Sequence, residues 1–116
     1  MSERRSNCPI ACALDLVGDR WTLLVLRDLF LGARYFDDFR SSSEGVATNI
    51  LGDRLRKLEQ AGLVSRTPEP NDKRRVRYEL TVRGRSVDKV LLAMRRWGLE
   101  NIDGTVSRPL HVVRSE

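Results

Sequence analysis

Residues 49–84 constrain the possible folds more than any other part of the chain. This run, NILGDRLRKLEQAGLVSRTPEPNDKRRVRYELTVRG, predicts in order an amphipathic helix, a glycine, two short strands joined by a turn, and the start of another helix. A helix followed by a basic hairpin is the order of elements in a helix-turn-helix with a β-wing. We therefore predict a mainly α-helical fold with a small β-wing.

The helix predicted for residues 48–61 has one narrow apolar side. At about 100° per residue, three leucines fall within about 60° of one another and form a core stripe, namely Leu51, Leu55 and Leu58. The opposite side carries polar groups and a glycine, from Asn49, Gly52, Asp53 and Arg56. Gly62 suits a left-handed cap at the end of this helix.

The predicted wing is strongly basic. Strands are expected at 63–67 and 75–80, with turn residues at 68–72 between them. Long cationic side chains lie at or beside the tip of this hairpin, where they would reach a phosphate backbone or a minor groove: Lys73, Arg74, Arg75 and Arg77.

The positive charge of the chain is concentrated in this region. Residues 1–44 carry six Lys/Arg and seven Asp/Glu, net −1, whereas residues 45–85 carry ten and five, net +5. A basic surface favours a polyanionic partner such as nucleic acid. On charge alone, a solvated basic face accounts for the count equally well.

Helices are predicted on both sides of this unit. A short helix is expected at 10–17 and a helix buried on most sides at 19–31. A brief strand at 34–36 would precede a short helix capped by Asp37. A last helix, capped by Thr81 and running to about residue 101, has an apolar face long enough to be a dimer surface.

Length and composition fit one domain. At 116 residues and 41% hydrophobic content, residues 1–103 are expected to form a DNA-binding and dimerisation domain and residues 104–116 a tail. No apolar run approaches the length of a membrane span, and no signal-like segment follows the N-terminus. We expect a cytoplasmic protein with no membrane partner.

The sequence offers little material for catalysis. The single histidine, His111, lies in the predicted tail without positioned partners, and neither a phosphate-binding glycine loop nor a zinc-type Cys/His spacing is present. We expect no catalytic residue, no metal site, no cofactor and no enzymatic activity. Cys8 and Cys12 are either two structural thiols or, at Cys8, a reactive thiolate favoured by a helix N-terminus and nearby cations.

Five segments together resemble the HxlR-type winged helix-turn-helix transcriptional regulators of bacteria. They are Cys8-Pro9, LDLVGDRWTLLVLRDLFLG at 14–32, YFDDF at 35–39, NILGDRLRKLEQAGLV at 49–64 and VRYELTVRG at 76–84. The resemblance implies a homodimer, built by N- and C-terminal helices, that acts as a repressor or activator on inverted-repeat operators. It also implies thiol sensing of electrophiles or oxidants at Cys8, as in several family members.

We expect the helix from Thr48 to enter the major groove and the wing to contact flanking DNA. The candidate DNA-binding residues are Thr48, Asn49, Gly52, Arg54, Arg56, Lys57, Lys73, Arg74, Arg75 and Arg77. Asparagine suits adenine and arginine suits guanine at base edges. The candidate dimer residues are Trp21, Val90, Leu91, Met94 and Trp97. The family commonly has serine where this chain has Ala47, so Thr48 is the alternative cap.

The function predicted is that of a sequence-specific double-stranded DNA-binding transcriptional regulator, a repressor, that responds to a small electrophile or another effector. Two alternatives remain open. One is a MarR- or PadR-like regulator with a small-molecule pocket, and the other is a winged-helix module that docks on a protein and has no DNA site.

Overall fold

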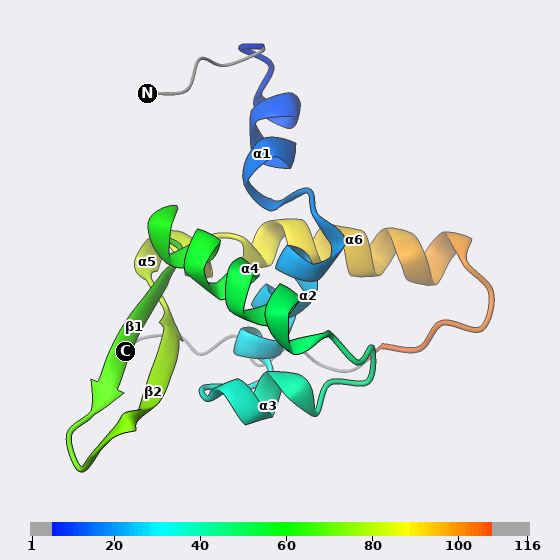
Figure 1. Cartoon of the computed structure of the whole chain (residues 1–116). Helices are drawn as coiled ribbons and strands as arrows, with labels where there is room; N and C mark the ends of the chain where they lie inside the picture. Colours follow the sequence, from blue (N-terminus) through cyan, green and yellow to red (C-terminus); the bar gives the residue numbers. More distant parts are fainter. Residues whose placement is uncertain (1–5, 108–116) are drawn as a thin grey trace.

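The computed structural model describes residues 6–107 (Figure 1). Its elements follow in the order α1 (Pro9–Val17), α2 (Arg20–Phe30), α3 (Phe36–Arg40), α4 (Thr48–Gln60), β1 (Val64–Glu69), β2 (Asp72–Leu80), α5 (Val82–Arg85) and α6 (Asp88–Asn101). Helices therefore dominate, and β1 and β2 form a two-stranded antiparallel sheet. The predicted fold class, mainly α with a small wing, is confirmed.

The core lies between α2 and α4. The predicted stripe of α4 is confirmed, because Leu51, Leu55 and Leu58 are all at most 2% exposed. Helix α2 contributes four further fully buried residues, which are Val25, Leu26, Leu29 and Phe30. Packing these two faces together fixes α4 with its polar side turned away from the core.

The segment between α2 and α4 differs from the prediction. No strand forms at residues 34–36, and Asp37 is not the cap of α3. Instead Asp38 Oδ2 accepts hydrogen bonds from the backbone N–H groups of Arg34 and Tyr35, each at 2.9 Å. This capping turns the chain into a helix at Phe36, and the Arg34 carbonyl accepts a hydrogen bond from Tyr78 N of β2 at 2.7 Å.

The wing has longer strands and a shorter turn than predicted. Its register runs regularly from Val64 opposite Leu80 to Pro68 opposite Val76, and then Glu69 lies opposite Asp72. This shift leaves residues 73–75 with no partner across the hairpin, so three consecutive cations lie on a bulge near the tip. Figure 1 shows the hairpin extending away from the helices.

The last helix is divided, contrary to the single helix predicted. Thr81 does cap it, accepting a hydrogen bond from Gly84 N at 3.0 Å, but α5 ends at Arg85 and α6 begins at Asp88. Gly84 packs so tightly that a Cβ there would lie 1.9 Å from the Leu63 carbonyl oxygen. The contact holds α5 against the base of the wing, and the chain must then turn to lay α6 along the core.

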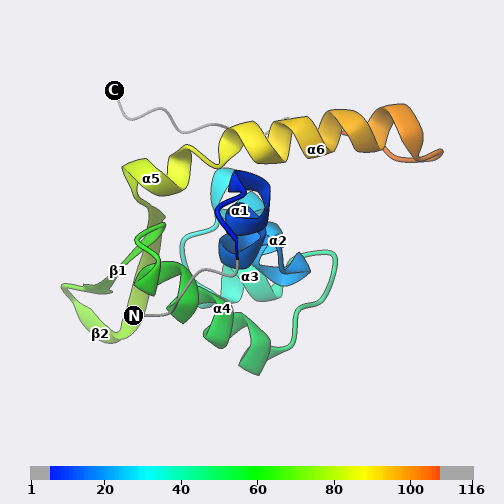
Figure 2. The same ribbon diagram turned by 90° about the horizontal axis from the view of Figure 1, so that it is seen from above.

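Helices α1 and α6 are the outlying parts of the molecule. In Figure 1, α1 stands above the body, and in Figure 2 the C-terminal half of α6 extends beyond the other helices. Both helices expose large apolar side chains, among them Ile10, Leu14, Met94 and Trp97.

Candidate nucleic-acid interface

The start of α4 differs from the expected cap. Ala47 occupies the N-cap position with an extended backbone and supplies no side-chain hydrogen bond, and Thr48 is the first helical residue. The prediction that Thr48 could replace the missing cap is therefore wrong, although the predicted start of the helix is correct. The exposed side chains of Thr48 and Asn49 leave this end of the helix open.

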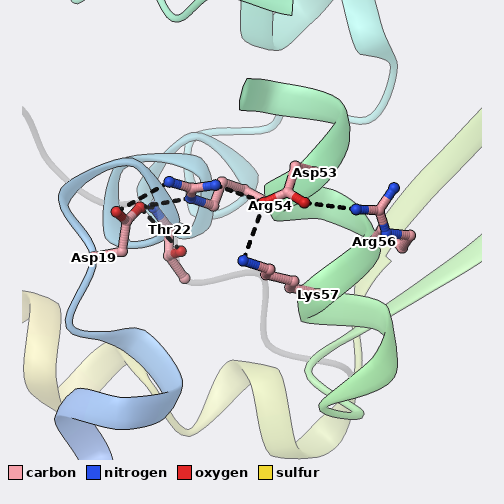
Figure 3. A network of polar contacts seen from close by, with 6 residues as sticks. All are labelled: Asp19, Thr22, Asp53, Arg54, Arg56 and Lys57. Atoms are coloured by element: carbon pink, nitrogen blue, oxygen red, sulfur yellow. Dashed lines mark hydrogen bonds and ion pairs between the residues drawn. The ribbon is translucent and has the colours of Figure 1, made fainter. Parts of the chain in front are cut away.

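A network of charges covers the polar face of α4 (Figure 3). Asp53 lies at its centre, where Oδ1 accepts a hydrogen bond from Arg56 Nη2 at 2.6 Å and Oδ2 accepts one from Arg54 Nη1 at 2.6 Å. Lys57 Nζ lies 3.3 Å from the same Oδ2. One carboxylate thus contacts three cations that the sequence assigned to DNA.

The three cations are not equally accessible. The side chains of Arg56 and Lys57 are 62% and 64% exposed, whereas that of Arg54 is 21% exposed. Arg54 points toward α2, and its Nε and Nη2 donate to the two carboxylate oxygens of Asp19 at 2.8 and 3.2 Å. Arg54 therefore joins α4 to α2, while Arg56 and Lys57 face outward.

Asp19 has a second structural role. It is the N-cap of α2 and accepts a hydrogen bond from Thr22 N at 3.1 Å. The hydrogen bonds from Arg54, assisted by the capping bond, lower the pKa of the Asp19 carboxyl to about 2. The carboxylate is thus charged throughout the neutral range and fixes the contact between the two helices.

The wing cations also divide into two groups. Lys73 and Arg74 are exposed, and the Arg74 side chain, 96% exposed, lies 3.6 Å from Asp72. Arg75 is also exposed, but its guanidinium lies 3.6 Å above the ring of Tyr35 as a cation–π contact. Arg77 Nε is 3.4 Å from Glu69 Oε1, an ion pair without a hydrogen bond among the described residues.

Tyr35 holds the wing to the helical body. Its hydroxyl donates to Glu69 Oε1 at 2.6 Å, while its ring contacts the Arg75 guanidinium. The hydrogen bond to the Glu69 carboxylate raises the pKa of Tyr35. Phe39 adds an edge-to-face contact with Tyr78 of β2, with ring centroids 6.3 Å apart. The direction of the hairpin is therefore set by contacts on both of its strands.

A second ion-pair cluster fixes the loop before α4. Arg27 of α2 donates to Glu44 at 2.6 and 3.0 Å and to Asp28 at 2.8 and 3.1 Å. The hydrogen bonds from Arg27 lower the pKa of Glu44 to about 2, whereas burial raises the pKa of Asp28. For Glu44 the hydrogen bonds from Arg27 thus outweigh the effect of burial on the pKa, whereas for Asp28 burial outweighs them.

The candidate dimer residues occupy different environments. Leu91 is 9% exposed and belongs to the core, and Trp21 is half-buried. Val90, Met94 and Trp97 are 41%, 53% and 62% exposed along α6. Cys8 is exposed at the start of α1, and Cys12, half-buried, donates from Sγ to the Ser6 carbonyl at 3.3 Å.

Within residues 6–107, His, Cys, Asp and Glu side chains form no group of three or more that would hold a metal ion. His111 lies outside the described residues. The helices of the described part of the chain also include none that is long and apolar enough to cross a membrane.

An exposed polar helix beside a basic two-stranded hairpin defines a winged helix-turn-helix domain. A family model for the HxlR-like helix-turn-helix matches residues 16–105, and the chain belongs to that family of transcriptional regulators. An uncharacterized HTH-type transcriptional regulator from Synechocystis is 42% identical over 91 residues, which cover 78% of this chain and 67% of the relative. One from Mycobacterium tuberculosis is 36% identical over 110 residues, covering 95% and 69%.

Solved structures agree with this assignment. PA1607, a candidate transcription factor, superposes with a TM-score of 0.81 at 36% identity, covering 90% of this chain and 75% of that one. The oxidised form of the redox regulator HypR gives 0.74 at 31% identity, with coverage of 83% and 99%. Reduced YodB, a transcriptional regulator from B. subtilis, gives 0.69 at 27% identity, with coverage of 87% and 100%.

Several residues that organise this surface were not assigned a role from the sequence. Asp19, Tyr35 and Glu69 make contacts between elements distant along the chain, which no local pattern identifies. Asp53 did carry a signal, because Arg56 and Lys57 follow it at the i+3 and i+4 spacing of helical ion pairs.

Proposed function

We propose that this regulator binds a specific sequence of double-stranded DNA as a homodimer and represses transcription from an inverted-repeat operator. The observation that carries the proposal is the outward face of α4, where Thr48, Asn49 and Arg56 are exposed next to the basic wing. We also propose that it acts in the cytoplasm and catalyses no reaction.

In this proposal α4 lies in the major groove and the wing contacts the flanking backbone. Thr48, Asn49, Gly52 and Arg56 face base edges or nearby phosphates, because amide and guanidinium groups match the edges of adenine and guanine. Lys57, Lys73 and Arg74 contact phosphates directly. Arg54, Arg75 and Arg77 belong to the same surface, and their bonds to Asp19, Tyr35 and Glu69 suit them to orienting α4 and the wing.

Salt dependence distinguishes this function from protein docking. The binding of a fluorescent duplex is measured from 50 to 300 mM salt for wild type and for the triple variant Arg74→Ala, Arg75→Ala, Arg77→Ala. DNA binding predicts weaker affinity and a slope of log K against log salt that is shallower by roughly 0.9 per phosphate contact removed. No measurable duplex binding by the folded wild type would favour the protein-docking alternative.

The homodimer is proposed from the apolar side chains that α1 and α6 leave exposed, including Trp97 at 62%. The Trp97→Ala variant should sediment as a smaller species than wild type at equal concentration. Trp97 suits this test better than Leu91, because Leu91 also fills the core. A variant that remained as dimeric as wild type would exclude Trp97 from the interface.

Redox or electrophile response at Cys8 is the second part of the proposal. Its support is the exposed thiol at the start of α1, together with the likeness to the redox regulator HypR. DNA affinity is measured before and after diamide in wild type and in Cys8→Ser. Loss of the response in the variant is expected, and equal responses in both proteins would refute a switch at Cys8.

A further inference from the structure

We propose that Asp53 is a specificity-determining residue of α4: it fixes the orientation of Arg56 for base contact and reduces the attraction of Arg56 and Lys57 to phosphates of unrelated DNA. The inference rests on the proposed DNA-binding function and adds a carboxylate to a surface otherwise assigned to cations. In Figure 3, Asp53 lies between Arg54 and Arg56, and Lys57 approaches it from below.

Asp53 is held rigidly from the protein side. Arg54 Nη1 donates to its Oδ2 at 2.6 Å, and Arg54 is itself bound to Asp19 of α2 at 2.8 Å. The Asp53 side chain is only 27% exposed. The carboxylate therefore has a fixed position relative to the core, which an aspartate on a solvated helix face would not have.

From this position Asp53 restrains the two exposed cations. Its Oδ1 accepts from Arg56 Nη2 at 2.6 Å, and its Oδ2 lies 3.3 Å from Lys57 Nζ. The bond to Asp53 uses one of the five N–H donors of the Arg56 guanidinium, so four donors remain to contact a base. The neighbouring Lys57 and Arg54 lower the pKa of Asp53, which keeps the carboxylate charged at neutral pH.

Helix stability does not account for this arrangement. Exposed ion pairs at i+3 and i+4 stabilise a helix only slightly, and a negative charge in the middle of a DNA-facing surface opposes phosphate binding. Non-specific affinity comes from neutralised phosphates, whereas specificity comes from base edges. A fixed carboxylate that lowers the affinity for phosphates and orients Arg56 toward base edges increases the ratio of specific to non-specific affinity.

The test uses Asp53→Asn, which removes the charge with little change in shape. Fluorescence anisotropy measures the affinity for a duplex enriched from a random pool by wild type and for an unrelated duplex of equal length, over a salt series. Affinity for the unrelated duplex should be higher in the variant than in wild type. If one phosphate contact is gained, this increase over wild type should be up to about eightfold larger in 0.1 M salt than in 1 M salt. Affinity for the enriched duplex should not rise, so the ratio of the two falls.

Two further variants separate this role from plain charge and from folding. Glu59→Gln removes an exposed negative charge from the same helix and should change both affinities by the same factor. In an Arg56→Ala background, Asp53→Asn should change the ratio less than it does in wild type, because only the effect through Lys57 remains. If Asp53→Asn folds poorly, the single variant Arg56→Ala, whose side chain is exposed, still tests whether Arg56 sets the ratio, which should then fall.

Two results overturn the inference. One is an unchanged ratio in Asp53→Asn when wild type discriminates between the duplexes, which leaves the proposed function intact. The other is an equal loss of affinity for both duplexes with a lower unfolding midpoint, as a purely structural residue would give. If wild type binds both duplexes equally, the proposed function fails, and the role of Asp53 fails with it.

Discussion

The guanidinium of Arg54 on α4 donates to both carboxylate oxygens of Asp19, the residue that caps the N-terminus of α2. These residues are 35 positions apart, and their bonds join the two helices that form most of the core. Because Arg54 also binds Asp53, the contact extends to the exposed face of α4. The orientation of the proposed DNA-binding surface thus depends on a cap in another helix.

Substitution of Asp19 should separate its two roles. Asparagine caps helices as well as aspartate does, so Asp19→Asn should lose only the charged contact with Arg54 and about 0.5–1 kcal/mol of unfolding free energy. Asp19→Ala should lose the cap as well and about 1–2 kcal/mol. Urea unfolding measures both, with Glu59→Gln as the control. Equal losses in the two variants would show that the charged contact with Arg54 alone matters, and no loss in Asp19→Asn would show that the cap alone matters.

Gly52→Ala should move stability and DNA affinity in opposite directions. A Cβ at Gly52 meets nothing within 4 Å, so alanine should stabilise the helix by about 0.5–1 kcal/mol. If α4 approaches the duplex through this face, the same methyl group occupies the contact and weakens binding. Thermal unfolding and anisotropy measure the two effects. A stabilised variant with unchanged affinity would place Gly52 outside the interface.

The wing should contain cations of two kinds. Arg74→Ala should leave the unfolding free energy within about 0.5 kcal/mol of wild type and reduce the salt slope by about 0.9, because the side chain is almost fully exposed. Arg77→Ala should lower the unfolding free energy by up to about 1 kcal/mol through its contact with Glu69. The reverse pattern in urea unfolding and salt titration would contradict this division.

Acid should remove the contribution of Glu44. Its pKa is lowered from 4.5 to about 2, so the stability that it adds is complete above about pH 4.5 and is lost as the pH falls through 2. We expect Glu44→Gln to be less stable than wild type by up to about 1 kcal/mol at pH 7. The difference should shrink as the pH falls from 4.5 toward 2 and vanish below pH 2. A difference that is constant with pH would mean that the charge of Glu44 does not stabilise the fold.

Local patterns predicted the elements, and tertiary contacts decided the rest. The leucine spacing of α4 and the turn residues of the wing are short-range signals, and both identified the correct elements. The strand expected at 34–36 does not form because the Arg34 and Tyr35 N–H groups, which a strand would pair, donate to the Asp38 carboxylate. The break between α5 and α6 follows the close packing of Gly84 on Leu63, a tertiary contact that no local pattern identifies.

For the candidate site, too, local patterns predicted the residues that face outward but not their tertiary contacts. Helical angles identified which residues of α4 face outward, including Arg56 and Asp53, but they treated each cation as free. The contacts of Arg54 with Asp19 and of Arg75 with Tyr35 join segments far apart in the chain. Only the fold distinguishes the cations that contact other elements, and so hold α4 and the wing in place, from those that do not.

Selection of bound sequences from a random duplex pool by the purified protein tests the central claim most directly. A homodimer that inserts two copies of α4 into successive major grooves, about 34 Å apart, should enrich an inverted repeat with half-site centres about 10 base pairs apart. That result would establish sequence specificity, symmetry and spacing together. A pool that remains as random as the input, from a protein shown to be folded, would contradict the claim.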